Sequence, residues 1–112
     1  MYKKIYYFLL IMIDGFYTFI GMAGCGKTSL AEYLNKKFNI TFVDTDRLIE
    51  MHESMVLEDI KKKNGYMYIR KIEEEIIMSL SNSQKIISTG GSAVYSNKAM
   101  DYLSSISKII FI

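Results

Sequence analysis

The segment GMAGCGKTSL at residues 21–30 constrains this chain more than any other feature of the sequence. Four residues separate Gly21 from the run Gly26-Lys27-Thr28, which is the spacing of a phosphate-binding loop. Such a loop lies between a buried strand and a helix, so that backbone amides converge on an anion at the helix N-terminus. The motif predicts an α/β fold that binds nucleotide phosphates; the alternative is a chance glycine-rich turn.

The residues on both sides of the loop favour the functional interpretation. The segment FYTFI at residues 16–20 is aromatic and β-branched, as a short buried strand should be. The following segment, residues 28–38, places Leu30, Leu34 and Phe38 on one stripe of a helix. A chance turn would require neither flank, so we interpret the motif as a genuine phosphate loop.

Each residue type in the loop has a chemical reason to be there. Glycines allow the tight backbone that points successive amides inward. Lys27 is long enough to reach the β- and γ-phosphates, and the Thr28 hydroxyl can bind Mg²⁺. We expect the nucleotide to contact Gly21, Gly24, Gly26, Lys27, Thr28 and Ser29.

The rest of the chain alternates between strand and helix patterns. We predict strands at 41–43, 85–88 and 108–112, and helices at 46–53, 55–64, 66–80 and 97–105. Ser54 is positioned to cap the helix over 55–64, and Gly65 to end it. The series predicts a parallel sheet covered by helices.

Two carboxylates follow the predicted strand at 41–43. Asp44 and Asp46 are two residues apart, so on an extended chain they point the same way, about 6.5 Å apart. Ligands gather at the carboxyl ends of parallel strands. One carboxylate can hold a metal while the other accepts a proton from a substrate hydroxyl. The alternative is that Asp46 only caps the next helix.

Two further motifs are weak alone. In YIRKIE, Arg70 and Glu73 are three residues apart on a helix and can pair, which would orient the guanidinium for an anionic substrate. The alternative is an ordinary surface ion pair. In ISTGGS, Gly90 and Gly91 let backbone amides approach a ligand, although a plain strand-to-loop turn explains them too.

The phosphate loop, D-T-D, R-x-x-E and T-G-G occur in an order and at a spacing that resemble the shikimate kinase family over residues 16–112. The resemblance implies a three-layer α/β P-loop kinase fold with a parallel sheet of strand order 2-3-1-4, and a cytoplasmic enzyme of aromatic amino-acid synthesis. That enzyme would use ATP and Mg²⁺ to phosphorylate the 3-hydroxyl of shikimate. The implied roles are catalysis by Lys27 and Asp46, shikimate binding by Asp46, Arg70, Gly90 and Gly91, and Mg²⁺ binding by Thr28 and Asp44.

The chain departs from the family pattern in two ways. Ser92 stands where the family carries a third glycine, and a side chain there could crowd the substrate or, at positive φ, cost about 1–2 kcal/mol. The sequence also stops at Ile112, before the family's lid, second substrate-binding arginine and fifth strand. We therefore expect a truncated domain with poor turnover. The alternatives are a gluconate kinase-like enzyme and a nucleotide-binding remnant without catalysis.

Composition and the remaining motifs bear on partners. A net charge of +2 is too small to indicate nucleic acid binding. We interpret residues 1–15 as an apolar extension, because the apolar run at 5–13 is too short to span a membrane; a membrane-associated leader is the alternative. We expect a monomer for the full domain and self-association of this chain through an exposed KIIFI edge.

Three smaller features have simple interpretations. Lys61-Lys62-Lys63 looks like a solvated helix end near the negative pole of the helix dipole. Cys25 lies near a helix N-terminus, where a redox role is conceivable, but an inert small residue is the preferred interpretation. His52 has no metal-ligand partners near it in sequence and is expected to be a polar surface residue.

Overall fold

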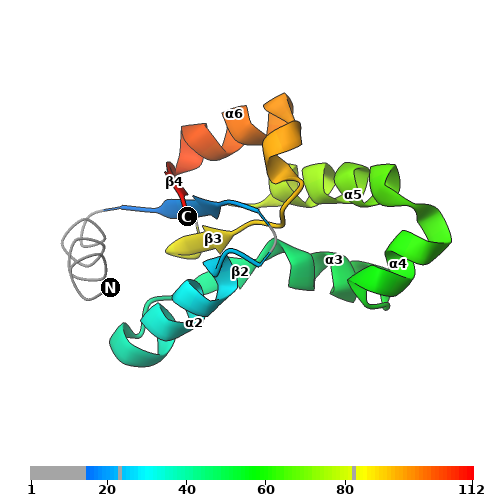
Figure 1. Ribbon diagram of the computed structural model, residues 1–112. Helices are drawn as coiled ribbons and strands as arrows, with labels where there is room; N and C mark the ends of the chain where they lie inside the picture. The colour runs from blue at the N-terminus through cyan, green and yellow to red at the C-terminus, as the bar shows by residue number, and fades with distance from the viewer. Residues whose placement is uncertain (1–14, 23, 82) are drawn as a thin grey trace.

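The computed structural model describes residues 15–22, 24–81 and 83–112, which form a parallel four-stranded sheet with helices on both faces (Figure 1). The strands are β1 (Tyr17–Ile20), β2 (Phe42–Asp44), β3 (Ile86–Ser88) and β4 (Lys108–Phe111). Their order in the sheet is β2-β3-β1-β4, which confirms the expected order. The extension at residues 1–15 was predicted from sequence, and all of it except Gly15 lies outside the described residues.

The helices fall close to the predicted segments. They are α2 (Lys27–Phe38), α3 (Thr45–Glu53), α4 (Leu57–Asn64), α5 (Tyr66–Ser79) and α6 (Asn97–Ile106), with a short 3₁₀ turn, η1 (Ala93–Tyr95). Among the described residues, no helix is both long and apolar enough to cross a bilayer.

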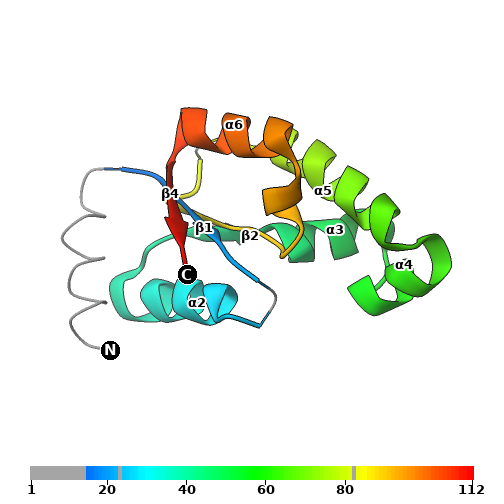
Figure 2. The same ribbon diagram turned by 45° about the horizontal axis from the view of Figure 1, so that its top comes forward.

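Alternating side chains of β1 build two cores, one on each face of the sheet. Tyr17 and Phe19 pack against Leu34 of α2 on one face. Ile20 packs on the other face, among residues of α5 and α6 that include Leu103. All four β1 residues are buried, as expected for a parallel strand covered on both sides. Figure 2 shows α2 and α6 on opposite faces of the sheet.

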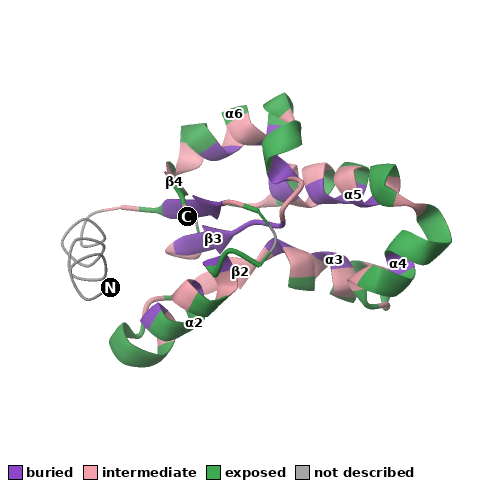
Figure 3. Ribbon diagram, in the orientation of Figure 1, coloured by how far each residue is buried: buried purple, intermediate pink, exposed green. Residues whose placement is uncertain are grey.

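A third core lies beyond the end of the sheet, where α3, α4 and α5 pack together. It is built from Ile49, Ile60, Ile69 and Ile72. These helices project away from the strands, and α4 is exposed over most of its surface (Figure 3). The arrangement places α4 at the end of α3 and α5 that lies farther from the sheet (Figure 1).

The prediction that Ser54 caps the next helix is wrong. Ser54 has a φ of 54° and ends α3, with its amide bonded to the carbonyl of Glu50. The side chain of Glu50 instead accepts the amide of Leu57, the first residue of α4, at 2.9 Å. Gly65, with a φ of 85°, does separate α4 from α5 as expected.

Strand β4 lies at the edge of the described sheet. Within residues 15–22, 24–81 and 83–112, it pairs only with β1. Phe111 on this strand is 72% exposed. The edge therefore presents apolar surface beside open backbone groups.

Candidate active site

The predicted site residues gather where three strands end. The phosphate loop follows β1, Asp44 is the last residue of β2, and Gly90 and Gly91 come just after β3. Because the strands are parallel, these ends lie on one edge of the sheet. Arg70 reaches the same region from α5, since it lines a cavity with Asp46 and Gly91.

The loop wraps around the side chain of Lys27. Gly24 and Gly26 adopt φ values of 80° and 99°, which favour glycine. The Nζ atom of Lys27 donates to the carbonyls of Gly21 at 2.6 Å and Met22 at 2.9 Å, and the side chain is 6% exposed. These two carbonyl partners satisfy a buried Nζ at the N-terminus of α2.

A cavity of about 230 Å³ opens beside the loop. Its lining residues are Gly24, Gly26, Lys27, Thr28, Ser29, Asp46, Thr89 and Gly91. Gly21 is not among them. An added Cβ at Gly21 would lie 2.7 Å from Cys25 Sγ and 3.2 Å from the carbonyl oxygen of Ile112, so close packing within the chain explains the glycine there.

Thr28 and Asp44 meet at the start of α2. The Thr28 hydroxyl donates to Asp44 Oδ2 at 3.2 Å, while Asp44 Oδ1 accepts the amide of Asp46 at 2.9 Å. Asp44 therefore caps α3, and the suggestion that Asp46 is the capping residue is wrong. The prediction that Asp44 and Asp46 point the same way along an extended chain is also wrong, because the chain becomes helical at Thr45.

The Thr28 and Asp44 oxygens fit a hard cation. Mg²⁺ takes oxygen ligands and is commonly held by one or two carboxylates together with phosphate oxygens and water. A hydroxyl and a carboxylate that already lie within 3.2 Å of each other, beside the loop, supply the protein's part of such a set. In the described part of the chain no cluster of three or more acidic, histidine or cysteine side chains offers a protein-only metal cage.

Asp46 occupies the junction between two cavities. Together with Gly91 it lines both the loop cavity and a larger one of about 410 Å³. Burial, together with the nearby carboxylates of Glu73 and Asp44, raises the pKa of Asp46 to about 6 despite the opposing effect of Lys27. The side chain can therefore exchange a proton close to neutral pH.

The larger cavity lies under α4 and the start of α5. Its lining residues are Met22, Asp46, Leu57, Lys61, Tyr66, Ile69, Arg70, Gly91, Ser92 and Tyr95. Its volume of about 410 Å³ falls within the roughly 300–1,000 Å³ typical of small-molecule sites. The mixture of apolar walls and a few charged groups suits a small polar ligand.

Glu73 does not pair with Arg70, so that prediction from spacing is wrong. Glu73 is 2% exposed, and its Oε2 accepts the Thr45 hydroxyl at 2.9 Å and the Gly90 amide at 2.8 Å. Its Oε1 accepts the hydroxyl of Ser92. These donors come from the ends of β2 and β3, and they occupy both oxygens that Arg70 would need.

Arg70 is left with its charge available. Its guanidinium carbon lies 4.3 Å from the ring centroid of Tyr95, and its Nε is buried without a hydrogen-bond partner. None of the described residues forms an ion pair with it. A cation held on an aromatic face keeps its charge while its orientation is fixed.

Ser92 causes no backbone strain. Its φ is −92°, so the cost expected for a side chain at positive φ does not arise. Its hydroxyl is taken up by Glu73, although Ser92 still lines the larger cavity. The residue that replaces a glycine here thus supplies one of the donors that hold Glu73 in place.

Two threonines that the sequence analysis did not assign to the site hold its strand ends together. The Thr45 hydroxyl donates to Glu73 and accepts the Gly90 amide at 2.9 Å. The Thr89 hydroxyl donates to the carbonyl of Phe19 at 2.9 Å and joins the ends of β1 and β3. Their signal in the sequence is a small hydroxyl residue directly after a buried strand, where backbone groups need partners.

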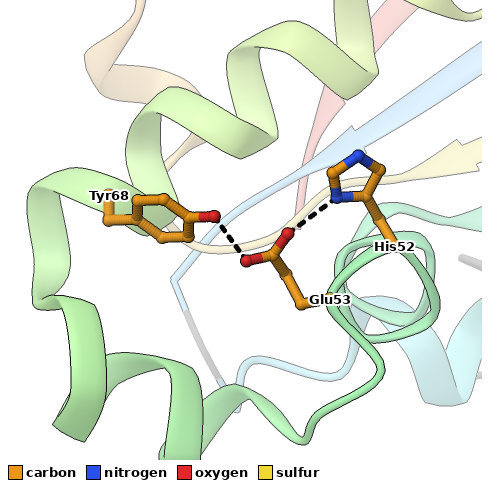
Figure 4. Close-up of polar contacts among 3 residues, drawn as sticks. All are labelled: His52, Glu53 and Tyr68. Atoms are coloured by element: carbon orange, nitrogen blue, oxygen red, sulfur yellow. Dashed lines mark hydrogen bonds and ion pairs between the residues drawn. The ribbon is translucent and has the colours of Figure 1, made fainter.

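A separate polar cluster joins the end of α3 to α5 (Figure 4). The Tyr68 hydroxyl donates to Glu53 at 2.5 Å, and the Nδ1 of His52 lies 2.8 Å from the other Glu53 oxygen. The Tyr68 hydrogen bond lowers the pKa of Glu53 and raises that of Tyr68. His52 is exposed, as expected, and the cluster lines neither of the two cavities at the site.

Comparisons with known proteins indicate the family of this chain. The family model of shikimate kinase matches residues 23–112. Shikimate kinase 2 of Photorhabdus laumondii is 28% identical, and shikimate kinase of Staphylococcus aureus 31% identical, each over 93 residues. Each match covers 83% of this chain and 53% of the relative, so the chain spans about half the length of the curated relatives it matches.

Solved structures show the same likeness. The crystal structure of shikimate kinase from Aquifex aeolicus is 31% identical with a TM-score of 0.75, over 86% of this chain and 58% of that one. The structure of shikimate kinase from Bacteroides thetaiotaomicron is 25% identical with a TM-score of 0.76, over 88% and 56%. The matched parts share the parallel sheet and its helices.

Proposed function

Because this chain belongs to the shikimate kinase family, we propose that it carries the nucleotide and acceptor sites of an enzyme that transfers the γ-phosphate of ATP to the 3-hydroxyl of shikimate. One observation carries the proposal. The loop cavity and the larger cavity share Asp46 and Gly91, so a phosphate donor and a hydroxyl acceptor would meet at a carboxylate.

The nucleotide side follows from the loop. We propose that the backbone at Gly21, Gly24 and Gly26 and the side chains of Lys27, Thr28 and Ser29 bind the phosphates. Lys27 would turn its ammonium from the carbonyls it now contacts toward the transferred group. Thr28 and Asp44 would hold Mg²⁺, which when bound neutralises charge on the phosphate oxygens.

The acceptor side follows from the larger cavity. Asp46, with a pKa of about 6, would accept the proton of the attacking hydroxyl. Arg70 would bind the carboxylate of the ring with its planar guanidinium. Gly90 has no room for a side chain, because an added Cβ would meet Asp46 and would lie 2.5 Å from Glu73 Oε2. Gly91 would line the ring's other side.

Binding measurements can separate the two carboxylates. Calorimetry with Mg²⁺ and ADP should show that Asp44→Asn weakens nucleotide binding, while Asp46→Asn leaves it within about twofold. Shikimate binding should respond in the opposite order. Equal loss of Mg²⁺–ADP affinity in the two variants would contradict this division of roles.

Turnover tests the substrate. A longer protein that contains this chain should release ADP from ATP with shikimate and not with gluconate, in a coupled assay. We expect the 112-residue chain alone to bind both ligands and to turn over slowly. Release of ADP with gluconate alone would overturn the assignment.

A further inference from the structure

The three consecutive lysines at the end of α4 do not form a single surface feature. Lys61 lines the larger cavity together with Leu57, which lies four residues earlier and therefore on the same face of the helix. All three lysines are exposed, but Lys62 and Lys63 line neither of the cavities described above. The run is a solvated helix end, as expected, and Lys61 differs from its neighbours only because it also lines the cavity.

Lys61 is held in the same manner as Arg70. Its Nζ lies 4.6 Å from the ring centroid of Tyr66, just as the Arg70 guanidinium lies 4.3 Å from the ring of Tyr95. Both tyrosines also line the cavity. Within the described ranges, neither cation has a carboxylate partner, so each is positioned by a ring that leaves its charge unneutralised.

The charge balance of the cavity points to an anionic ligand. Of its ten lining residues, two are cations and Asp46 is the single acid. Asp46 sits at the junction with the loop cavity, whereas Lys61 and Tyr66 come from α4 and the first turn of α5. All three lysines lie in the last turn of α4, where the helix dipole favours a cation, so the dipole does not explain why one of them lines the cavity.

We propose that Lys61 is a second anion-binding residue of the larger cavity. In this proposal Lys61 and Arg70 together bind the carboxylate of the acceptor. The inference rests on the proposed function, because it assigns the acceptor's anionic group to this end of the cavity. Arg70 offers a planar pair of donors, while Lys61 offers a mobile point charge on a flexible stem. The two cations would hold the ring so that its hydroxyls lie toward Asp46.

The test uses the full 112-residue chain and two ligands, shikimate and cyclohexenecarboxylate. The second ligand keeps the ring and the carboxylate but lacks the hydroxyls. Lys61→Met is compared with Lys62→Met, which removes the same charge from the next position of the same helix. Binding is measured by calorimetry and by the side-chain NMR signal of the lysine.

We expect Lys61→Met to weaken binding of both carboxylates about 5- to 10-fold, as loss of one charge-assisted contact should. Lys62→Met should change either affinity by less than about twofold, because Lys62 does not line the cavity and a solvated charge acts weakly at a distance. Addition of either ligand to the unsubstituted chain should shift the Lys61 signal and leave that of Lys62 in place.

The outcomes separate this inference from the proposed function. If shikimate binds and the two lysine variants bind it equally, the role of Lys61 is wrong while the function stands. If shikimate binds no better than cyclohexenecarboxylate but Lys61→Met weakens both, the anion site stands and the proposed acceptor is wrong. If the unsubstituted chain binds neither ligand, both proposals fail.

Discussion

Glu73 accepts the backbone amide of Gly90 at 2.8 Å with the same carboxylate oxygen that accepts the hydroxyl of Thr45 at 2.9 Å. One buried side chain on α5 thereby joins the end of β2 to the end of β3. Hydrogen bonds to a charged group contribute more than neutral ones, and burial makes an unsatisfied partner costly. The relationship explains why Glu73 forms no ion pair with Arg70, three residues away.

Gly90→Ala should destabilise the fold by about 1–3 kcal/mol, because the added methyl group would overlap with the Asp46 and Glu73 carboxylates. Urea unfolding followed by circular dichroism would measure the loss. Gly15→Ala serves as the control, since its new Cβ would meet the Tyr17 hydroxyl oxygen at an ordinary 3.5 Å. Equal stability of the two variants would show that the turn after β3 moves freely to make room.

Ser92→Ala should remove the hydrogen bond that Glu73 Oε1 accepts and cost about 1–2 kcal/mol in the free energy of unfolding. The freed oxygen should also draw the Arg70 guanidinium away from Tyr95, which the NMR signal of Arg70 Nε would report. The control is Ser79→Ala, where the lost hydroxyl bond lies on an exposed helix turn. An unchanged Nε signal would argue against competition between Ser92 and Arg70 for Glu73.

Asp46→Asn should change how stability depends on pH. The folded-state pKa of Asp46 is raised to about 6 from 3.8, so its protonated form is favoured by folding. That contribution is complete below about pH 4 and is lost as the pH rises through 6. The variant should therefore gain stability relative to the native chain between pH 4 and 7, by about 1 kcal/mol after solvent screening.

Chemical denaturation at several pH values would measure this difference. Asp101→Asn on α6 corrects for the general effect of losing one exposed carboxylate. A difference between the Asp46 variant and the native chain that stays constant over this range would contradict the raised pKa.

Phe111→Lys should reduce self-association of the chain. Phe111 is 72% exposed on β4, the edge strand of the described sheet, and a charge there disfavours pairing with another copy. Light scattering at high micromolar concentration would compare the variants. Met51→Lys, at a 69% exposed position on α3, adds the same charge away from the edge and should have little effect. Equal scattering by both variants would place the association elsewhere.

Local signals in the sequence predicted most of the fold. The phosphate loop lies between a strand and a helix because its glycines, apolar flanks and helical stripe all agree. The resemblance of four motifs to the shikimate kinase family implied the order of the strands in the sheet, and that order is confirmed. Ser54 failed as a predicted cap, because Glu50 supplies a side-chain acceptor to α4 from the previous helix.

The site was harder to predict because its contacts join distant segments. Spacing permits an Arg70–Glu73 pair, but it carries no information about donors from the end of β3 that compete for the same carboxylate. Likewise, three adjacent lysines look alike in sequence. Only the packing of α4 against α5 decides that Lys61 lines a cavity and its neighbours do not.

The Thr89 hydroxyl and the carbonyl of Phe19 that it contacts are separated by 70 positions along the chain. Parallel pairing of β1 with β3 requires that whole intervening segment to be gathered first, and the loop-closure entropy is paid before any strand contact forms. The phosphate loop can form locally. The turn after β3, which lines the same cavity through Thr89 and Gly91, reaches the loop only when β3 pairs with β1. Refolding experiments should therefore detect helix formation before the chain regains affinity for nucleotide, so newly made copies would pass through a stage that is helical and cannot yet bind.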